Sequence, residues 1–378
     1  AGGAALIEKA LPLLGSGAQL PAPRSVVLNI AFTAEGLQAC GLDERSLAGL
    51  PHEFRQGMAN RCGLLGDLHH NHPRRWTLPP LNWEAGLDPA WKAADDTPVV
   101  PTELVHVLLQ WRWIAAQDPS DAPVADPTAP TKALADAARA LLAGLESVRP
   151  LSVQWLARVD EQGRRLDHFG FADGQSQPVY DRASAGTIFP NQVAPGEVLV
   201  GHDNAADHAA DLPENRDPAK AWLRDGSYLV VRKLSLDTAS YRQAVDSAAD
   251  ANKLDRHLVL GKMMGRWPQG SPHPGHPMVA ADPATPNDFD FADDASGQSC
   301  PFAAHIRLAN PRRSVSTEPD DSGSLTEIPG GRPPRMVRTG LPYGPKAPDW
   351  PSPGRGGPLD DGQDRGLVFM AYNASIAE

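Results

Sequence analysis

SVVLNIAFTAEGL, residues Ser25–Leu37, joins a strand signal directly to a helix signal. The apolar and β-branched residues of Ser25–Thr33 alternate with a period of two, which predicts a half-buried strand. Thr33 can then cap a short helix with its side-chain oxygen, and we expect that helix to end at Gly41. A strand that leads straight into a helix predicts a mixed α and β architecture at this end of the chain.

Further helices and strands are predicted along the rest of the chain, and they do not alternate in a regular order. We expect helices at Ala4–Leu14, Glu44–Asn60, Lys132–Val148 and Thr238–Gly261, and strands at Glu103–Trp113, Leu151–Val159, Ser227–Leu234 and Leu367–Asn373. A polar, proline-rich loop is expected at His69–Pro80. Because the steady βα alternation of a doubly wound sheet is missing, the order predicts an α+β protein of two similar-sized halves with antiparallel sheets.

The composition excludes several classes of protein. The 378 residues carry 35 Lys and Arg against 46 Asp and Glu, a net charge of −11, which argues against a general nucleic-acid surface. The three cysteines lie far apart, so neither a disulfide framework nor a thiolate zinc site is expected. No apolar run is long enough to cross a bilayer. We therefore expect a protein of a reducing compartment, placed in the cytoplasm. Because the first residue is Ala1 rather than Met, we also expect a leader or an opening segment before this sequence.

GFADGQSQP, Gly170–Pro178, places a carboxylate, Asp173, between glycines. In the simpler interpretation the Asp–Gly pair marks a turn. In the functional interpretation, glycines such as Gly170 let the backbone approach a ligand closely while Asp173 is presented to it.

CPFAAHIRLANPR, Cys300–Arg312, surrounds His305 with small and apolar residues. A histidine in such a place is either a core residue or an axial ligand of haem iron, for which small neighbours leave room. The nearby Arg307 and Arg312 could pair with haem propionates, because a guanidinium matches a carboxylate. Their alternative role is solvated surface.

RMVRTGLPYGP, Arg335–Pro345, sets Arg338 between apolar Val337 and an expected turn at Gly340–Gly344. An arginine held in this way could stabilise developing negative charge or form a structural salt bridge. By contrast, the triple His69, His70 and His72 reads as a solvated loop rather than a metal site, since Asp67 alone lies nearby as a further ligand type.

Taken together, four ordered motifs resemble those of the dye-decolorising (DyP-type) haem peroxidases. They are GFADGQSQP (170–178), NDFDFADD (287–294), CPFAAHIRLANPR (300–312) and VRTGLPYG (337–344), and the stretches NIAFTAEGL (29–37) and DGSYLVVRKL (225–234) are also similar. The resemblance implies an α+β fold of two ferredoxin-like halves, like a dimeric α/β barrel. The halves would be residues 1–160 and 161–378, with one haem b in the second half and hydrogen peroxide as oxidant.

The resemblance also implies roles for individual residues. His305 matches the proximal iron ligand, Asp173 the distal acid and base, and Arg338 the distal arginine, and whether Asp173 or Arg338 matters more stays open. Arg312 matches a propionate partner, and Leu367 and Phe369 match residues that line the distal pocket. Dyes, phenols or similar reductants would give up single electrons, directly or through a surface residue.

Several points remain open at the level of the sequence. Trp267 and Tyr343 are candidates for such an electron relay, with core packing as the favoured alternative for both. The family pattern leads us to expect a missing first strand and a missing C-terminal part. A haem carrier or iron-handling protein with little turnover is the alternative function. Homo-oligomerisation is undecided, and no nucleic-acid or membrane partner is expected.

Overall fold

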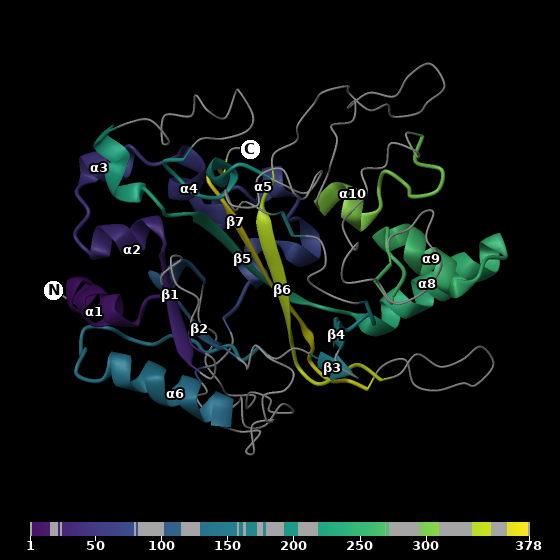
Figure 1. The fold of residues 1–378 in the computed structure, drawn as a ribbon, viewed down its shortest axis with the longest axis horizontal. Helices are drawn as coiled ribbons and strands as arrows, with labels where there is room; N and C mark the ends of the chain where they lie inside the picture. Colours follow the sequence, from purple (N-terminus) through teal and green to yellow (C-terminus); the bar gives the residue numbers. More distant parts are fainter. Residues whose placement is uncertain are drawn as a thin grey trace. The chain divides into compact units, whose positions relative to one another are not determined.

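The computed structural model divides into two compact units, residues 1–155 and residues 156–376 (Figure 1). The structure describes residues 2–15, 22, 25–78, 81, 102–114, 129–156, 159–161, 164–171, 177–178, 193–202, 218–268, 270–271, 294, 296–309, 335–348 and 361–376. Helices and antiparallel sheets occur in both units, which confirms the predicted α+β class. The strands in the described parts of the chain form open sheets and no closed barrel.

The first unit is built on a two-stranded antiparallel sheet of β1 (Val26–Phe32) and β2 (Val107–Trp113). Strand β1 confirms the prediction for Ser25–Thr33. Thr33 then caps α2 (Ala34–Ala39), because its Oγ1 accepts a hydrogen bond of 3.0 Å from the Gly36 amide. The Thr33 amide donates to the carbonyl of His106, which ties the start of α2 to the start of β2.

Two helices cover one face of this sheet, α1 (Gly2–Ala10) and α6 (Ala129–Leu142) (Figure 1). Their apolar faces meet in a core formed by Leu6, Ala10, Leu28 and Leu141. The predicted helix Ala4–Leu14 was too long, since Pro12 lies in a 3₁₀ turn, Leu11–Leu13, that follows α1. The predicted helix Lys132–Val148 was also too long, because the chain leaves the helix before Gly144, whose φ is +74°.

The helical segment after α2 is divided into three short helices, α3 (Glu44–Ala48), α4 (His52–Asn60) and α5 (Cys62–Leu65). The predicted continuous helix Glu44–Asn60 is therefore wrong. Pro51 has no amide hydrogen to continue α3, and it serves as the N-cap of α4. The described residues that follow include 3₁₀ turns at His69–Asn71, Pro73–Arg75 and Thr102–Leu104. The last of them replaces the first part of the predicted strand Glu103–Trp113.

The second unit contains a three-stranded antiparallel sheet with the order β5–β7–β6. Its strands are β5 (Tyr228–Ser235), β7 (Gly366–Asn373) and β6 (Val337–Tyr343). The predicted strands Ser227–Leu234 and Leu367–Asn373 are confirmed. The turn expected at Gly340–Gly344 is wrong for most of its length, because β6 continues to Tyr343.

The two faces of this sheet differ in character. Tyr343, Val368 and Met370 point to one face and form an apolar core. The alternate residues point to the other face, and Arg338 lies among them. Strand β6 is an edge strand, which explains how it tolerates Pro342 in its interior.

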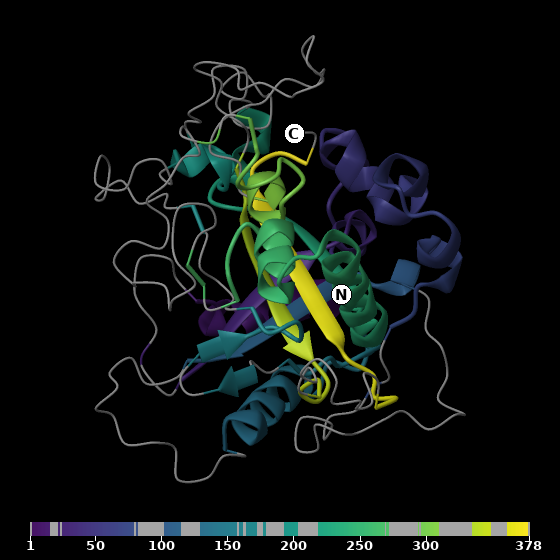
Figure 2. The ribbon, with the colours of Figure 1, turned by 90° about the vertical axis from the view of Figure 1, so that its right-hand side faces the viewer.

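Helices α8 (Thr238–Asn252), α9 (Arg256–Met264) and α10 (His305–Ala309) lie on one side of the sheet (Figure 2). The predicted single helix Thr238–Gly261 is wrong. Lys253 takes a left-handed conformation with φ of 53° and ends α8, and Asp255 then caps α9. An apolar core joins these helices to an earlier segment of the chain. In it, Val245 of α8 and Leu260 of α9 pack with Phe171.

The remaining elements of the second unit are short. Strands β3 (Val159–Glu161) and β4 (Arg164–Leu166) form a small hairpin, and 3₁₀ turns occur at Pro195–Glu197 and Pro218–Leu223. The predicted strand Leu151–Val159 is wrong for residues 151–156, which lack regular structure, while Val159 begins β3. Alternating apolar residues predict a strand only when a partner strand supplies hydrogen bonds. Within the described parts of the chain, no helix has the length and apolar character needed to span a membrane.

Candidate functional site

The sheet of the second unit places Arg338, Leu367 and Phe369 on one face. Arg338 pairs with Ala371 across the β6–β7 ladder, and Phe369 and Leu367 follow at alternate positions on β7. All three side chains are half-buried. Gly340 leaves space for one of them, because a Cβ atom at this position would lie 2.8 Å from Leu367 Cδ1. The face therefore offers a guanidinium beside half-buried apolar groups.

The main chain of Arg338 is held by the side chain of Gln177. The Arg338 amide donates to Gln177 Oε1 at 3.2 Å, and Gln177 Nε2 donates to the Arg338 carbonyl. A side-chain amide thus takes the place of a neighbouring strand on the side of β6 that faces away from β7. Gln177 belongs to the GFADGQSQP motif, whose carboxylate, Asp173, lies outside the described residues.

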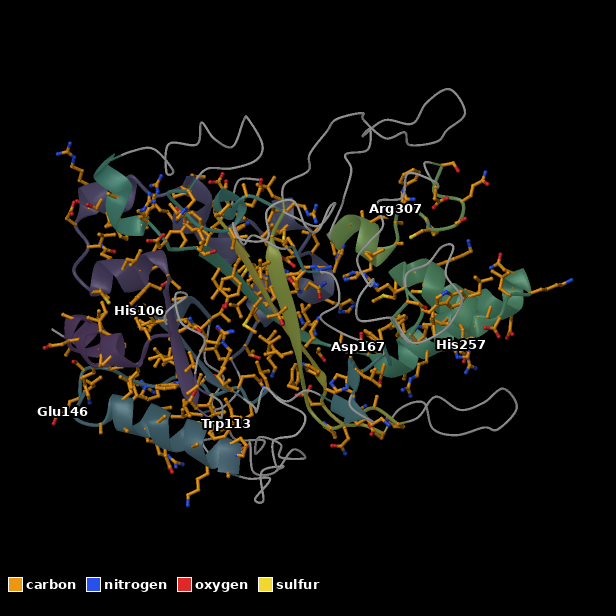
Figure 3. All side chains as sticks on the ribbon, in the orientation of Figure 1. His106, Trp113, Glu146, Asp167, His257 and Arg307 are labelled. Atoms are coloured by element: carbon orange, nitrogen blue, oxygen red, sulfur yellow. The ribbon has the colours of Figure 1, made fainter. Side chains whose placement is uncertain are left out.

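The start of that motif is a tight turn. Gly170 has φ of +88°, which an L side chain rarely adopts. Asp167 Oδ1 accepts hydrogen bonds of 2.9 Å from the amides of Phe169 and Phe171 (Figure 3). Gly170 thus forms a turn at the start of the motif, while the Asp–Gly pair of the turn interpretation, at positions 173 and 174, lies outside the described residues. The interpretation of Asp173 as a catalytic group stays a prediction.

A buried histidine connects this turn to the end of β6. His168 is 4% exposed, and its Nε2 donates to the carbonyl of Tyr343 at 2.9 Å. Burial lowers the pKa of His168, and the positive charge of Arg365 lowers it further. The neutral form of His168 is therefore the one that fits the folded protein.

His305 is the first residue of α10, and its side chain is exposed. Its neighbours Ala304 and Ile306 point the other way, into a small core with Cys300. The protein atoms that surround the imidazole lower its pKa, and the charge of Arg338 adds to this effect. His305 therefore presents a neutral, accessible ring nitrogen at pH 7, which is the form that ligates iron. The exposure of His305 does not support the alternative in which this histidine is a core residue.

The charges of three arginines influence one another in this region. Burial, followed by the charge of Arg338, lowers the pKa of Arg266 to about 10. Burial also lowers the pKa of Arg335 to about 10, and Arg338 contributes to that shift, while the carboxylate of Glu197 opposes it. The Arg335 amide also donates to Glu197 Oε2 at 3.4 Å. Arg266 and Arg335 are both buried, so their guanidinium groups belong to the interior of the unit.

Arg307, predicted as a propionate partner, is engaged elsewhere. Its Nη2 donates to Asp294 Oδ2 at 2.9 Å and to the Asp294 carbonyl at 2.7 Å. Both side chains are 7% exposed, so this is a buried ion pair. Figure 3 labels Arg307 on α10. Arg312, the other residue predicted to pair with a haem propionate, lies outside the described residues.

The other candidates are placed as follows. Tyr343 is 5% exposed and belongs to the apolar core, as the packing alternative predicts. Trp267 is half-buried, and its amide donates to the Ser271 carbonyl. His69 and His70 are exposed. The described part of the chain contains no group of three or more His, Cys, Asp or Glu residues that could hold a metal ion.

Sequence reasoning missed the roles of Gln177 and Asp294. Each makes side-chain hydrogen bonds to the main chain of a predicted site segment. Hydrogen bonds from a side chain to the main chain leave no periodic pattern in the sequence. The signal that could have found them is their position inside the motifs GFADGQSQP and NDFDFADD, next to the residues that carry the chemistry.

Comparison with curated proteins finds several relatives, although no family model matches the chain. Dye-decolorizing peroxidase msp1 of Mycetinis scorodonius is 33% identical over 230 residues, which cover 57% of this chain and 41% of the relative. The multifunctional dye peroxidase DyP2 of Amycolatopsis is 31% identical over 257 residues, 65% of this chain and 52% of the relative. A dye-decolorizing peroxidase of Exidia glandulosa is 28% identical over 97% of this chain and 63% of the relative. The matched part thus covers less than two thirds of each of these proteins.

Solved structures share the fold. An ancestral D-type dye decolorizing peroxidase has a TM-score of 0.66 at 23% identity, over 99% of this chain and 75% of that one. A decolorizing peroxidase of Auricularia auricula-judae has a TM-score of 0.64 at 21% identity, over 100% of this chain and 76% of that one. The predicted ferredoxin-like α+β fold is therefore confirmed.

Proposed function

We propose that this chain, a homologue of the dye-decolorising peroxidases with their fold, is a haem b peroxidase that oxidises dyes, phenols or similar reductants with hydrogen peroxide. The observation that carries the proposal is the placement of His305 and Arg338 in the second unit. A neutral, accessible imidazole lies close enough to an arginine for the guanidinium charge to lower its pKa. A group that could ligate iron and a group that could stabilise charge therefore lie within electrostatic range of each other, which supports a role in peroxidase chemistry.

The described residues fit a flat, apolar and anionic cofactor. His305 would ligate the iron, with its exposed ring directed away from the core around Cys300. Leu367 and Phe369 offer half-buried apolar contact beside Arg338. Arg266 and Arg335 add two guanidinium groups within range of the charge of Arg338, and this residue type suits the carboxylates of a haem. Arg307 is assigned to the support of α10, because Asp294 already engages its guanidinium.

Haem, when bound, supplies the redox-active iron at which the O–O bond of a peroxide is cleaved. The protein supplies the groups that control charge and protons around it. His305 donates electron density as a neutral ligand. Arg338 stays protonated at every relevant pH, so it stabilises the hydroperoxide anion and the charge that develops as the O–O bond breaks.

Asp173 is the proposed proton carrier. As a carboxylate it would accept the proton from the first peroxide oxygen and deliver it to the departing oxygen, which leaves as water. An aspartate with an ordinary pKa of about 3.9 remains ionised in mild acid. The proton transfer should therefore persist at pH values where a distal histidine would already be charged.

The proposal is tested by a haemin titration followed by one equivalent of hydrogen peroxide, monitored by absorption spectroscopy. We expect stoichiometric binding of haem, a histidine-ligated ferric spectrum and a rapid spectral change with peroxide. Haem binding should be lost in His305→Ala and kept in His257→Ala, an exposed histidine on α9 that serves as a matched control. Haem binding without reaction with peroxide would instead indicate a carrier, and full haem binding by His305→Ala would exclude His305 as the ligand.

A further inference from the structure

Asp294 is the centre of a buried hydrogen-bond cluster. Its Oδ1 accepts from the Ser299 amide at 3.0 Å, and its Oδ2 accepts from the Cys300 amide at 2.8 Å. Oδ2 also accepts from Arg307 Nη2 at 2.9 Å. The main-chain carbonyl of Asp294 accepts from the Arg307 guanidinium and from the Gly297 amide. One residue therefore satisfies donors from four positions in the following segment.

The positions that Asp294 holds lie on both sides of His305 in the sequence. Ser299 and Cys300 precede the histidine, and Arg307 follows it by two residues on the same helix. The Arg307 guanidinium also lies over the ring of Phe302, 4.7 Å from its centroid. The segment that carries His305 is thus closed into a loop whose two ends meet at one carboxylate.

Close contacts with α9 leave little room for α10 to shift. Gly265, which ends α9 with φ of +78°, comes so close that a Cβ atom there would lie 2.0 Å from Ile306 Cγ2. Lys262 on α9 donates to the carbonyls of Gln298 and Ser299 at 3.1 and 3.3 Å. Because α10 is only five residues long, its direction depends on these contacts rather than on its own hydrogen bonds.

We propose that Asp294 is a positioning residue that sets the direction of the His305 imidazole. It touches neither His305 nor the place where a reactant would bind, and it acts through the main chain of Cys300 and the guanidinium of Arg307. Partners that hydrogen-bond directly to a metal ligand commonly affect the affinity of a metal centre by 10- to 100-fold, and we expect the indirect effect of Asp294 to lie at the lower end of this range. The inference rests on the proposed function insofar as His305 is taken as the iron ligand.

The test compares Asp294→Asn with Asp361→Asn. The amide of Asp294→Asn keeps the shape of the side chain but removes the charge that holds Arg307. Asp361→Asn removes the partner of another arginine in the same unit, since Asp361 Oδ2 lies 2.7 Å from Nη2 of the buried Arg365. It therefore controls for the general loss of an ion pair. Arg307→Lys serves as a second, milder variant should Asp294→Asn fail to fold.

Two measurements distinguish a role of Asp294 in positioning His305 from a role in the stability of the fold alone. The first is the haem dissociation constant together with the iron–histidine stretching frequency of the ferrous protein. We expect Asp294→Asn to weaken haem binding by about tenfold or more and to shift or broaden this stretching band. Arg307→Lys should have a smaller effect of the same kind, and Asp361→Asn should leave both quantities unchanged. Wild-type values in Asp294→Asn and Arg307→Lys would overturn the proposal.

The second readout needs no haem and so distinguishes a failure of the inference from a failure of the proposed function. In the haem-free protein, the ring signals of His305 in an NMR spectrum should form one narrow set. Asp294→Asn should split or broaden this set, while Asp361→Asn should not. If wild-type protein does not bind haem, the proposed function fails, and the ring signals still decide whether Asp294 positions His305. An unchanged His305 spectrum in Asp294→Asn would overturn the inference.

Discussion

The sheets of the two units are both antiparallel, yet they use their second faces differently. In the first unit, β1 and β2 bury Leu28 against helices, and on the other face Arg112 reaches across to Asn29 at an exposed position. In the second unit, the face opposite the apolar core carries Arg338 among half-buried side chains. The charge of Arg338 contributes to the lowered pKa of His305. A cation has strong chemical effects where water is partly excluded, so the second sheet is the one suited to a reaction.

The comparison predicts that the two strand arginines are not equivalent. Arg338→Leu should leave haem bound but slow the reaction with peroxide by about 10²- to 10³-fold, as expected for loss of one preorganised charge-stabilising group. Arg112→Leu, the matched change on β2, should leave that rate unchanged. Stopped-flow absorption with peroxide in excess measures both. Equal rates in the two variants would remove Arg338 from the mechanism.

A core substitution tests the first sheet by itself. Leu28 is fully buried, and Leu28→Ala should lower the free energy of unfolding of the first unit by about 2–4 kcal/mol through lost contacts and the cavity left behind. Val27 is half-buried on the opposite face, so Val27→Ala should have less than half this effect. Hydrogen exchange of the β1 and β2 amides, measured for both variants, checks the ratio. Equal losses of protection would contradict the two-faced description of this sheet.

The second unit should respond to mild acid through His168. Its pKa is lowered in the folded state, so below the ordinary value of about 6.5 the unfolded chain binds the proton first. Stability should therefore be fully present above pH 6.5 and decrease as the pH falls from there, by at most about 1.4 kcal/mol per pH unit for this group. His305 has the same sign of shift.

Denaturant unfolding between pH 7.5 and 5.0 measures this dependence. His168→Gln should flatten the curve, because the substituted side chain does not titrate. His257→Ala, which changes an exposed histidine, should keep the wild-type slope. A His168→Gln protein with the wild-type slope would show that other groups carry the pH dependence.

The smallest expected effect concerns Gln177. Gln177→Ala removes both hydrogen bonds to the Arg338 main chain and should lower the free energy of unfolding by about 1 kcal/mol. Local protection of the Arg338 amide against hydrogen exchange should fall, while that of the neighbouring Thr339 amide should change less. Unchanged protection at Arg338 would mean that Gln177 is dispensable for this edge of β6.

The sequence predicted those elements whose residues repeat with a clear period. Strands β1, β5 and β7 were expected nearly within their observed bounds, as was the Thr33 cap. The errors arose where a single residue interrupts a good pattern. Lys253 ends α8 in a left-handed conformation that its residue type does not favour, so the end of α8 had no signal in the sequence. The start of α9 did have one, because Asp255 is a residue type that caps helices.

The candidate site was predictable to the extent that its residues lie in recognisable motifs. His305 and Arg338 were singled out from their sequence neighbours, and in the structure the charge of Arg338 is one of the two causes that lower the pKa of His305. The partners of these residues were not predictable. The bond from Gln177 to Arg338 spans 161 positions, and only the folded chain brings such positions together.

Pro342 has a consequence for the association of this protein with itself. The Arg338 amide and carbonyl point outward to Gln177, and in a strand the groups of every second residue point the same way, so Pro342 also faces outward. Its ring therefore removes a donor from this side of β6 without removing a bond to β7, and other residues bury it. A second strand that approaches this side meets the side-chain amide of Gln177 at Arg338 and a covered position without a donor at Pro342. Both positions therefore disfavour the addition of a strand and the aggregation that would follow from it.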